Sequence, residues 1–451
     1  MFLLAIKSPV CGENVKVVKF GGSSLADAAH FKQVRDIILA DPTRRFVVPS
    51  APGKRFPGDS KVTDMLYDCY TIAASGGNFD EAFSRITARY NDIIEGLSLD
   101  LDLTEEFEGI KSAIRNHAGR DFAASRGEYL NGIVLAAYLG FDFIDAASVI
   151  CFADNGTFDA RCTNTLLSAE LAQHKCAVIP GFYGSMPNGT LKTFSRGGSD
   201  ITGSIVARAS EAALYENWTD VSGFLMADPR IIPSPLGIKT ITYRELRELS
   251  YMGATVLHED SIFPVRFAGI PINIRNTNEP EAPGTMILPT SDEFDTEHII
   301  TGIAGKKGFC VVNIEKDMMN SEVGFGRKVL EVLEHEGVCF EHLPSGIDTM
   351  SIVLNETELE GHKDRIVSGI CRTVDPDSVS IESGLALLAV VGRGMVKTPG
   401  TAARVFSAIA NAGINIKMID QGSSELSIIV AVAENELEKA LRAIYEEFVR
   451  A

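Results

Sequence analysis

The segment from residue 15 to residue 51 constrains the fold more strongly than any other part of the sequence. VKVVKF is a β-branched run typical of a buried strand, GGSS is a turn, and LADAAHFKQVRDIILA has apolar residues at helical spacing. A second strand, RFVVPSA, follows this helix and ends before PGK. Strand, turn, helix and strand in this order predict a right-handed βαβ unit, and therefore an α/β fold with a mainly parallel sheet between helices.

The length of the chain indicates how many domains it forms, and its charge indicates which classes of partner are disfavoured. With 451 residues, the chain is too long for a single core and is expected to form two or three domains. Its net charge of −18 comes from acidic residues spread along the sequence, which disfavours nucleic acid and anionic membranes as partners. The eight cysteines are scattered without a C-x-x-C pair, a distribution typical of a cytoplasmic protein with free thiols.

Changes in the sequence pattern predict the domain boundaries. Residues 1–14 contain an apolar run that is too short for a secretory signal or a membrane span, and we expect a leader of unknown role. The α/β pattern ends near Leu288, and the polar stretch TSDEFDTEH marks the main boundary. Two segments then repeat a strand–helix–strand–strand–helix order, typical of ferredoxin-like α+β modules. The expected domains are 15–296, 297–380 and 381–451.

The motif KFGGSS, Lys19 to Ser24, has the composition of an anion site. Paired glycines after a strand allow the backbone to approach an anion closely, and the next helix directs its N–H groups at it. Lys19, at the carboxyl end of the strand, could hold a phosphoryl group as a point charge. The motif is not a Walker loop, because it lacks G-x-x-x-x-G-K-[ST]. A plain tight turn is the alternative interpretation of the two glycines.

Two further loops carry chemistry at the ends of predicted strands. FSRGGSD places Arg196 and Asp200 within one turn; a guanidinium suits a carboxylate, while Asp200 can receive an ammonium or organise Lys19. TDVSGFLMADPR follows the strand ALYENW, and such a loop is where an open α/β sheet binds its ligand. A capping turn explains Asp228 equally well. Glu128 is expected to open a helix, where an acidic residue commonly serves in capping.

Taken together, these motifs resemble one enzyme family. From about Val17 to Ala451, the sequence is similar to aspartate kinases in the order of KFGGSS, VVPSAPG with KVTDML, GEYL, VIPGFYG, SRGGSD, WTDVSGF…DPR and GATVLH. The two C-terminal modules resemble the paired ACT domains of that family. The resemblance implies an amino-acid-kinase-like fold and transfer of the γ-phosphoryl group of ATP to the side-chain carboxylate of L-aspartate. This is the first step of lysine, threonine and methionine biosynthesis.

The resemblance also implies the site residues. The phosphoryl-transfer site would comprise Lys19, Gly21, Gly22 and Ser23. The aspartate pocket would comprise Ser50, Thr63, Glu128, Arg196, Gly198, Ser199 and Asp200. The nucleotide would contact Thr219, Asp220 and Arg230. Mg²⁺ is expected to be carried mainly by the nucleotide phosphates, without a metal site of the protein's own.

The sequence departs from the family pattern at two positions of the nucleotide site. Thr255 stands where a phosphate-contacting lysine is expected, and Leu225 replaces an aromatic residue. Lys239 or Arg266 could supply the missing positive charge.

The chemistry of the acceptor explains why no general base is expected. A carboxylate with a pKa near ~3.9 is already ionised at pH 7, which agrees with the lack of a histidine motif near the glycine loops. Catalysis then consists of bringing two anions together and neutralising the developing charge, the role expected of Lys19. Arg196 would clamp the α-carboxylate of the substrate, and Glu128 with Asp200 would bind its ammonium.

The C-terminal modules are expected to sense an amino acid. In the first module the turn NSEVGFG leads into a helix whose N–H groups could receive an effector carboxylate. By resemblance the effector site comprises Ser321, Gly324, Phe325, Glu341 and Asp348. Lysine is the expected effector and threonine the alternative; both acids could instead be solvated surface charges. The modules are also expected to build a homodimer or a dimer of dimers.

Three other functions fit parts of the sequence. A kinase of the same fold acting on another acid or on carbamate is disfavoured by the pair Arg196 and Glu128. A catalytically dead amino-acid sensor is disfavoured by the intact KFGG and SRGGSD motifs. The length leaves no room after Ala451 for the dinucleotide-binding domain of a bifunctional kinase–dehydrogenase.

Overall fold

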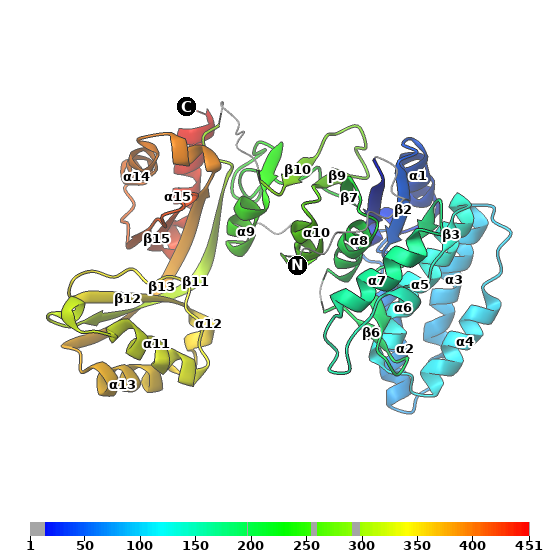
Figure 1. Ribbon diagram of the computed structural model, residues 1–451, viewed down its shortest axis with the longest axis horizontal. Helices are drawn as coiled ribbons and strands as arrows, with labels where there is room; N and C mark the ends of the chain where they lie inside the picture. The colour runs from blue at the N-terminus through cyan, green and yellow to red at the C-terminus, as the bar shows by residue number, and fades with distance from the viewer. Residues whose placement is uncertain (1–13, 196, 254–258, 291–297, 451) are drawn as a thin grey trace, which may run out of the picture. The chain divides into compact units, whose positions relative to one another are not determined.

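The computed structural model describes residues 14–195, 197–253, 259–290 and 298–450, which form two compact units (Figure 1). The first unit contains residues 1–224, 237–243 and 256–291, and the second contains residues 225–236, 244–255 and 292–451. Two short segments that precede the ACT-like modules in sequence thus belong to the second unit. The leader before residue 14, Arg196, Thr255 and most of the expected linker lie outside the described residues.

Within the described residues, the first unit is built on an eight-stranded sheet with the order β3-β4-β2-β1-β7-β9-β10-β8. Every neighbouring pair is parallel except β9 and β10, so the prediction of a mainly parallel sheet is confirmed. The strands are β1 (Lys16–Phe20), β2 (Arg44–Pro49), β3 (Asp142–Phe143), β4 (Ala177–Val178), β7 (Leu214–Thr219), β8 (Thr240–Thr242), β9 (Ile272–Asn276) and β10 (Thr285–Leu288), with the hairpin β5 (Tyr183–Ser185) and β6 (Leu191–Thr193) beside them.

Helices cover this sheet, and the sequence explains where several of them start and stop. Asp27 accepts hydrogen bonds from two N–H groups in the first turn of α1, and Gly140, at φ +68°, ends α5 in the left-handed conformation. The helices and helical turns are η1 (Gly22–Leu25), α1 (Ala28–Leu39), α2 (Val62–Ala74), α3 (Asp80–Gly96), α4 (Thr104–Arg115), α5 (Arg120–Leu139), α6 (Ala146–Val149), α7 (Ala160–Leu171), α8 (Gly198–Ala209), η2 (Glu259–Ile262) and α10 (Phe263–Ala268). Figure 1 shows α2, α3, α4 and α5 gathered beside the sheet.

Successive side chains of β1 and β7 alternate between the two faces of the sheet, so the last residues of each strand place an aromatic ring on one face and a polar group on the other. Phe20 and Trp218 stack at 5.9 Å between ring centroids and belong to the core that α1–α5 complete. Lys19 and Asn217 are in register on the neighbouring strands and point to the other face, where α8 packs. The parallel register therefore delivers a lysine and an asparagine to the same point.

The second unit contains a five-stranded antiparallel sheet with the order β12-β11-β13-β15-β14. Its strands are β11 (Gly302–Glu315), β12 (Thr349–Asn355), β13 (Ser378–Val391), β14 (Met418–Asp420) and β15 (Ser427–Ala433). Its helices and helical turns are α9 (Tyr243–Tyr251, from Arg244 onward), η3 (Met319–Ser321), α11 (Phe325–Glu336), α12 (Glu356–Leu359), α13 (Lys363–Val374), η4 (Arg393–Lys397), α14 (Thr401–Asn411), η5 (Glu434–Glu436), α15 (Leu437–Tyr445) and η6 (Glu446–Arg450).

The two ACT-like modules share their central strands. β11 and β13 pair along almost their whole lengths; β12 extends one half of this ribbon, and β15 extends the other. The expected boundary between residues 380 and 381 falls inside β13. VCFEHLP does not form the regular strand expected from it: the segment meets β12 through an isolated bridge between His342 and Val353 and through the Pro344 carbonyl, which accepts from the N–H of Ser351 at 2.9 Å. Pro344 has no N–H group with which to continue the pairing.

None of the helices in the described ranges is long and apolar enough to cross a membrane.

Candidate active site

The carboxyl ends of β1 and β2 bring two glycine-containing loops into direct contact. The N–H of Gly53 donates to the carbonyl of Gly22 at 2.8 Å. A Cβ on Gly22 would lie 2.7 Å from the carbonyl oxygen of Ala51, and one on Gly53 would lie 2.6 Å from the carbonyl carbon of Gly22. The motifs KFGGSS and PSAPG therefore both need glycine here, because two backbones touch where side chains would otherwise stand.

A buried ion pair lies beside these loops. The ammonium of Lys19 is 2.6 Å from Oδ1 of Asp200, and Nδ2 of Asn217 donates to the same oxygen at 2.9 Å. The Lys19 side chain is only 9% exposed, so its charge is held largely away from water. This contact is the one that organising Lys19, one of the two roles predicted for Asp200, requires.

The first turn of α8 packs against the segment VIPGFYG. A Cβ on Gly181 would lie 2.7 Å from the Cβ of Ser199, and one on Gly198 would lie 2.4 Å from the ring of Phe182. The hydroxyl of Thr202 accepts from the N–H of Phe182 at 3.0 Å and donates to the carbonyl of Gly198 at 2.9 Å. These contacts fix the turn that follows Arg196, which itself lies outside the described residues.

Glu128 lies in the interior of α5, which begins at Arg120, so the expectation that it opens a helix is wrong. The residue is 5% exposed, and burial raises the pKa of its carboxyl group to about 8, although the N–H of Ala51 opposes this rise. Its Oε2 atom has no hydrogen-bond partner among the described residues. A capping role is thereby excluded, and a buried acidic group with an unused acceptor requires another explanation.

Asn131, one turn further along α5, has the same character. Its Nδ2 donates to the carbonyl of Ser50 at 2.6 Å, while its Oδ1 has no partner among the described residues. Glu128 and Asn131 therefore both contact the loop that follows β2, and each keeps an acceptor free. Such a pair suits a ligand that carries hydrogen-bond donors, as an ammonium group does.

Other expected site residues line the same edge of the sheet. Ser50 continues the β1–β2 pairing through an N–H bond to the carbonyl of Phe20 at 3.0 Å, and Thr63 lies in the first turn of α2. The N–H of Gly21 donates to the carbonyl of Trp218 at 3.1 Å, and a Cβ on Gly21 would be 3.7 Å from the Lys19 ammonium. Ser23 is exposed in η1. Thr219 ends β7, and Asp220 follows it, exposed.

Arg230 belongs to the second unit with the rest of the segment 225–236, which includes Leu225. Its exposed guanidinium pairs with Asp228 at 2.6 Å, and Asp228 also accepts from the Arg230 N–H at 2.8 Å. This is the local capping turn that was the alternative interpretation of Asp228. Lys239 and Arg266, the expected substitutes for the lysine missing at position 255, are both exposed in the first unit.

Sequence reasoning missed two positioning residues. Asn217 holds Asp200, and Arg89, only 3% exposed in α3, donates to the carbonyl of Gly53 at 3.1 Å and to Asp59 at 2.6 Å. Arg89 thereby anchors the loop that touches Gly22. A signal was present in both cases: each is a polar residue at a position where the strand or helix pattern is buried.

In the first ACT-like module, the turn before α11 meets the loop before β12. Gly324, at φ +82°, starts α11 without a side-chain cap, and Phe325 is buried. Oδ1 of Asp348 accepts from the N–H of Met318 at 2.8 Å, so this acid lies beside the turn that contains Ser321. Glu341, in contrast, accepts a hydrogen bond from the hydroxyl of Tyr251.

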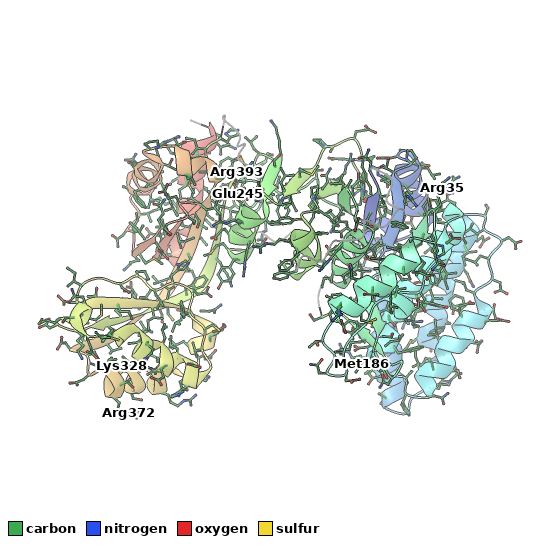
Figure 2. All side chains as sticks on the ribbon, viewed as in Figure 1. Arg35, Met186, Glu245, Lys328, Arg372 and Arg393 are labelled. Atoms are coloured by element: carbon green, nitrogen blue, oxygen red, sulfur yellow. The ribbon has the colours of Figure 1, made fainter. Side chains whose placement is uncertain are left out.

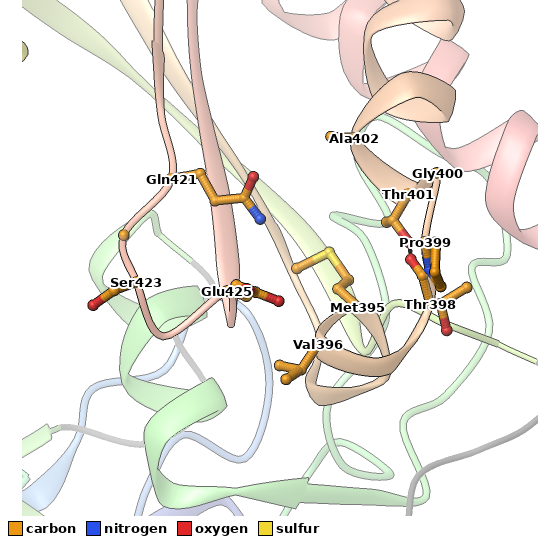
Figure 3. Close-up of a pocket in the computed structure, with 11 residues that line it drawn as sticks. Met395, Val396, Thr398, Pro399, Gly400, Thr401, Ala402, Gln421, Ser423 and Glu425 are labelled. Atoms are coloured by element: carbon orange, nitrogen blue, oxygen red, sulfur yellow. Dashed lines mark hydrogen bonds between the residues drawn. The ribbon is translucent and has the colours of Figure 1, made fainter.

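The second module repeats this turn. Gly400, at φ +89°, starts α14 without a side-chain cap, as Gly324 starts α11. A hollow of about 570 Å³ lies between this turn and the loop from β14 to β15, with Gln421 and Glu425 on its far side (Figure 3).

Comparison with known proteins defines the class of this fold and site. A model of the amino acid kinase family matches residues 14–276, and a model of the ACT domain matches residues 388–448. The chain therefore belongs to the amino acid kinase family and carries an ACT domain at its C-terminal end.

Individual relatives narrow the class. Aspartokinase 3 of Bacillus subtilis is 40% identical over 96% of this chain and 98% of its own length. The solved aspartate kinase of Clostridium acetobutylicum is 52% identical, with a TM-score of 0.86 over 96% of this chain and 100% of that one. Aspartokinase III of E. coli, 24% identical, shares the fold in two solved structures, each of which covers 96% of this chain and 99% of its own. The TM-score is 0.70 for the complex with aspartate and ADP and 0.69 for the complex with lysine and aspartate. Within its family, the chain is an aspartokinase, as the motifs predicted.

Proposed function

We propose that the chain transfers the γ-phosphoryl group of ATP to the side-chain carboxylate of L-aspartate, yielding ADP and 4-phospho-L-aspartate. The observation that carries this proposal is the buried pair Lys19–Asp200, at 2.6 Å, beside the two glycine loops that meet at Gly22 and Gly53. The E. coli aspartokinase III solved with aspartate and ADP supports it at the level of the fold. The reaction is the first step of lysine, threonine and methionine biosynthesis, and we propose a cytoplasmic location for it.

Lys19 is the catalytic residue of the transfer step. Its ammonium contacts Asp200, and Asn217 holds that carboxylate in place. When phosphates occupy the glycine loops, the same ammonium turns to the oxygens on which negative charge develops, while the N–H group of Gly22 contributes a further donor. The acceptor carboxylate is ionised at neutral pH, so no side chain has to remove a proton from it.

The glycine loops fit a nucleotide triphosphate that carries its own metal ion. Asp200 is engaged by Lys19 and Asn217. The turn at Gly22, which has no side chain and leads into η1, would receive the phosphates. Mg²⁺ bound to the phosphates would neutralise part of their charge. Thr219, Asp220 and Arg230 are proposed to contact the nucleotide, and Lys239 or Arg266 to replace the charge absent at Thr255.

Glu128 selects a substrate that carries an ammonium group. Its unused Oε2 and raised pKa of about 8 are what a buried carboxyl shows before its cationic partner arrives. Binding of the substrate ammonium would ionise Glu128, and Arg196 would clamp the α-carboxylate. With both α groups fixed among Ser50, Thr63, Gly198 and Ser199, the β-carboxylate faces the nucleotide.

An assay of ADP release with aspartate, glutamate and acetylglutamate as acceptors tests the proposal. Aspartate should support turnover, because its β-carboxylate is the one that reaches the γ-phosphate. Glutamate should react far more slowly, since one additional methylene displaces the nucleophile, and acetylglutamate should not react because it lacks the ammonium. Turnover with another acid and none with aspartate would contradict the assignment.

The regulatory part of the proposal is feedback inhibition by lysine, bound in the first ACT-like module. The uncapped start of α11 at Gly324 offers N–H groups to the effector carboxylate, and Asp348 lies beside this turn. Ser321, Phe325 and Glu341 complete the proposed site. Threonine, which needs one acid and an apolar wall, is the alternative effector. The modules are proposed to pair between subunits, in a homodimer or a dimer of dimers.

A further inference from the structure

Two cysteines that are separate in sequence meet in the first unit. The Sγ atoms of Cys151 and Cys162 are 2.6 Å apart, and both residues are free thiols that are partly exposed. A disulfide requires about 2.05 Å, so the covalent bond needs only a small further approach. Scattered spacing suggested isolated thiols, because ten intervening residues conceal a contact that only the fold creates.

Backbone hydrogen bonds hold this pair in register. Cys162 lies in the first turn of α7, where its N–H donates to Oδ1 of Asp159 at 2.9 Å. The N–H of Cys151 donates to the hydroxyl of Thr163 at 2.9 Å, and its carbonyl accepts from the N–H of Asp159 at 2.9 Å. The N–H and the carbonyl of Cys151 are thus both hydrogen-bonded to the start of α7. The backbone therefore holds the two cysteines close together.

We propose that Cys151 and Cys162 form a site of reversible oxidation, closing an intramolecular disulfide when the chain meets a peroxide or a low-molecular-weight disulfide. With hydrogen peroxide, one thiolate sulfur attacks an oxygen and forms a sulfenic acid as the first water leaves. The second thiol then displaces the sulfenic oxygen as a second water. Two thiols and one peroxide give one disulfide and two waters, and an added dithiol reverses the reaction by exchange.

Each sulfur lies in the surroundings of the other. Burial raises the pKa of the Cys151 thiol, and its hydrogen bond and charge interaction with Cys162 raise this pKa further. Either sulfur can take the first oxygen while the other closes the bond, so both orders give the same disulfide.

The segment that the disulfide would close packs beside Phe194 and, through Phe182, beside the first turn of α8. The rings of Phe152 and Phe158 lie 5.0 Å and 5.6 Å from the ring of Phe194, measured between centroids. The N–H of Phe194 donates to the carbonyl of Phe182 at 3.0 Å, and Phe182 packs against Gly198. Because the sulfurs are already close, oxidation should stiffen this segment with little displacement, and the oxidised enzyme should keep its turnover at moderate temperature.

The test begins with the reduced, purified full chain, treated with hydrogen peroxide or with oxidised glutathione. Remaining thiols are alkylated under denaturing conditions, and protease digestion with mass spectrometry maps the linked peptides. Two thiols per chain should be lost, with Cys151 joined to Cys162 in the same chain, and dithiothreitol should restore both. The Tm of the catalytic unit should rise by roughly 5 °C on oxidation, because a loop of twelve residues becomes closed.

Three variants separate this pair from the other cysteines. Cys151→Ser and Cys162→Ser should each abolish the linked peptide and the rise in Tm, while Cys176→Ser, a partly buried thiol of the same unit, should keep both. If the serine variants do not fold, the peptide map of the unaltered chain decides alone. A link between other cysteines or between two chains, or no link under conditions that oxidise the exposed Cys339, would overturn the proposal.

Discussion

The ammonium of Lys19 and Oδ1 of Asp200 are 2.6 Å apart, joining the end of β1 to the first turn of α8. The pair is largely buried, and a buried charge is stable only while it has a partner. Asp200 therefore holds the Lys19 ammonium beside the glycine loops, and in the proposed reaction phosphate oxygens take its place when nucleotide binds. A lysine held in this way costs little reorganisation at the moment of transfer.

Lys19→Ala should lower kcat by roughly a hundredfold or more, because it removes about 3 kcal/mol of stabilisation realised in the transition state. The affinity for nucleotide should change much less. Steady-state kinetics with a separate measurement of ADP binding distinguish the two effects. Lys32→Ala, on the exposed face of α1, is the matched control and should leave both quantities unchanged. Near-normal turnover of Lys19→Ala would remove the catalytic assignment.

The titration of Glu128 should be visible in substrate binding. Burial raises the pKa of this carboxyl from 4.5 to about 8, so it is protonated at neutral pH. A substrate ammonium favours the ionised form, so KM for aspartate should fall as pH rises toward 8 and then level off. Glu128→Gln should raise KM for aspartate and abolish this dependence. Superimposable pH profiles for the two proteins would contradict a contact between Glu128 and the ammonium.

The same group affects stability with a defined sign. Between pH 4.5 and about 8 the folded chain keeps the Glu128 proton while the unfolded chain loses it. The contribution of Glu128 to the free energy of unfolding is therefore complete below pH 4.5 and is lost as pH rises to about 8, by up to about 1.4 kcal/mol per pH unit. Glu128→Gln, which cannot ionise, should gain stability relative to the unaltered chain across this interval. Denaturant unfolding at several pH values measures the difference.

The sequence predicted the parallel sheet because β1, α1 and β2 each carry a clear local pattern. It also predicted that KFGGSS and SRGGSD serve one function, and the contact of Lys19 with Asp200 shows how they meet. The position of Glu128 inside α5 could not be predicted. GEYL has a helical pattern whether the helix begins at Glu128 or, as the structure shows, at Arg120. Arg89 and Asn217 were missed because their contacts, with the Gly53 carbonyl and with the Asp200 carboxylate, depend on the packing of α3 and α8.

Arg196→Ala should raise KM for aspartate more than KM for ATP, because the guanidinium is assigned to the α-carboxylate of the substrate. Arg196→Lys should restore little, since a point charge cannot reproduce a bidentate fork. Kinetics with each substrate varied in turn measure both constants. Equal increases in the two KM values would instead place Arg196 at the phosphates.

The second unit contains a buried ion pair whose loss should be costly. Glu245 of α9 is fully buried and pairs with Arg393 of η4 at 2.6 Å; it also accepts from the hydroxyl of Thr301 (Figure 2). Arg393→Ala should destabilise this unit by about 3 kcal/mol or more, because it removes a guanidinium that pairs with a fully buried carboxylate. Arg327→Ala, which breaks an exposed pair with Glu331, should cost at most about 1 kcal/mol. Similar losses in denaturant unfolding would contradict the distinction.

The expected effector acids already have partners, which shapes the variants that can test them. Oδ1 of Asp348 accepts from the N–H of Met318 at 2.8 Å, and Glu341 accepts from the hydroxyl of Tyr251. Alanine at either position would disturb these local contacts as well as remove charge. Asp348→Asn and Glu341→Gln keep an oxygen acceptor and remove only the charge, so any loss of effector binding is easier to attribute to electrostatics.

Millimolar lysine should inhibit the unaltered chain, and each of these two variants should weaken inhibition by roughly tenfold or more, because a charged hydrogen bond contributes about 1.5–3 kcal/mol. Uninhibited kcat should stay nearly constant, since binding acts by favouring one of two states of the enzyme and not through the chemistry itself. Glu425→Gln, beside the hollow of the second module, is the matched control and should keep full sensitivity to lysine. Inhibition curves and thermal unfolding with added lysine provide the measurements. If neither lysine nor threonine, alone or together, changes the rate or the Tm, the first module does not bind these effectors.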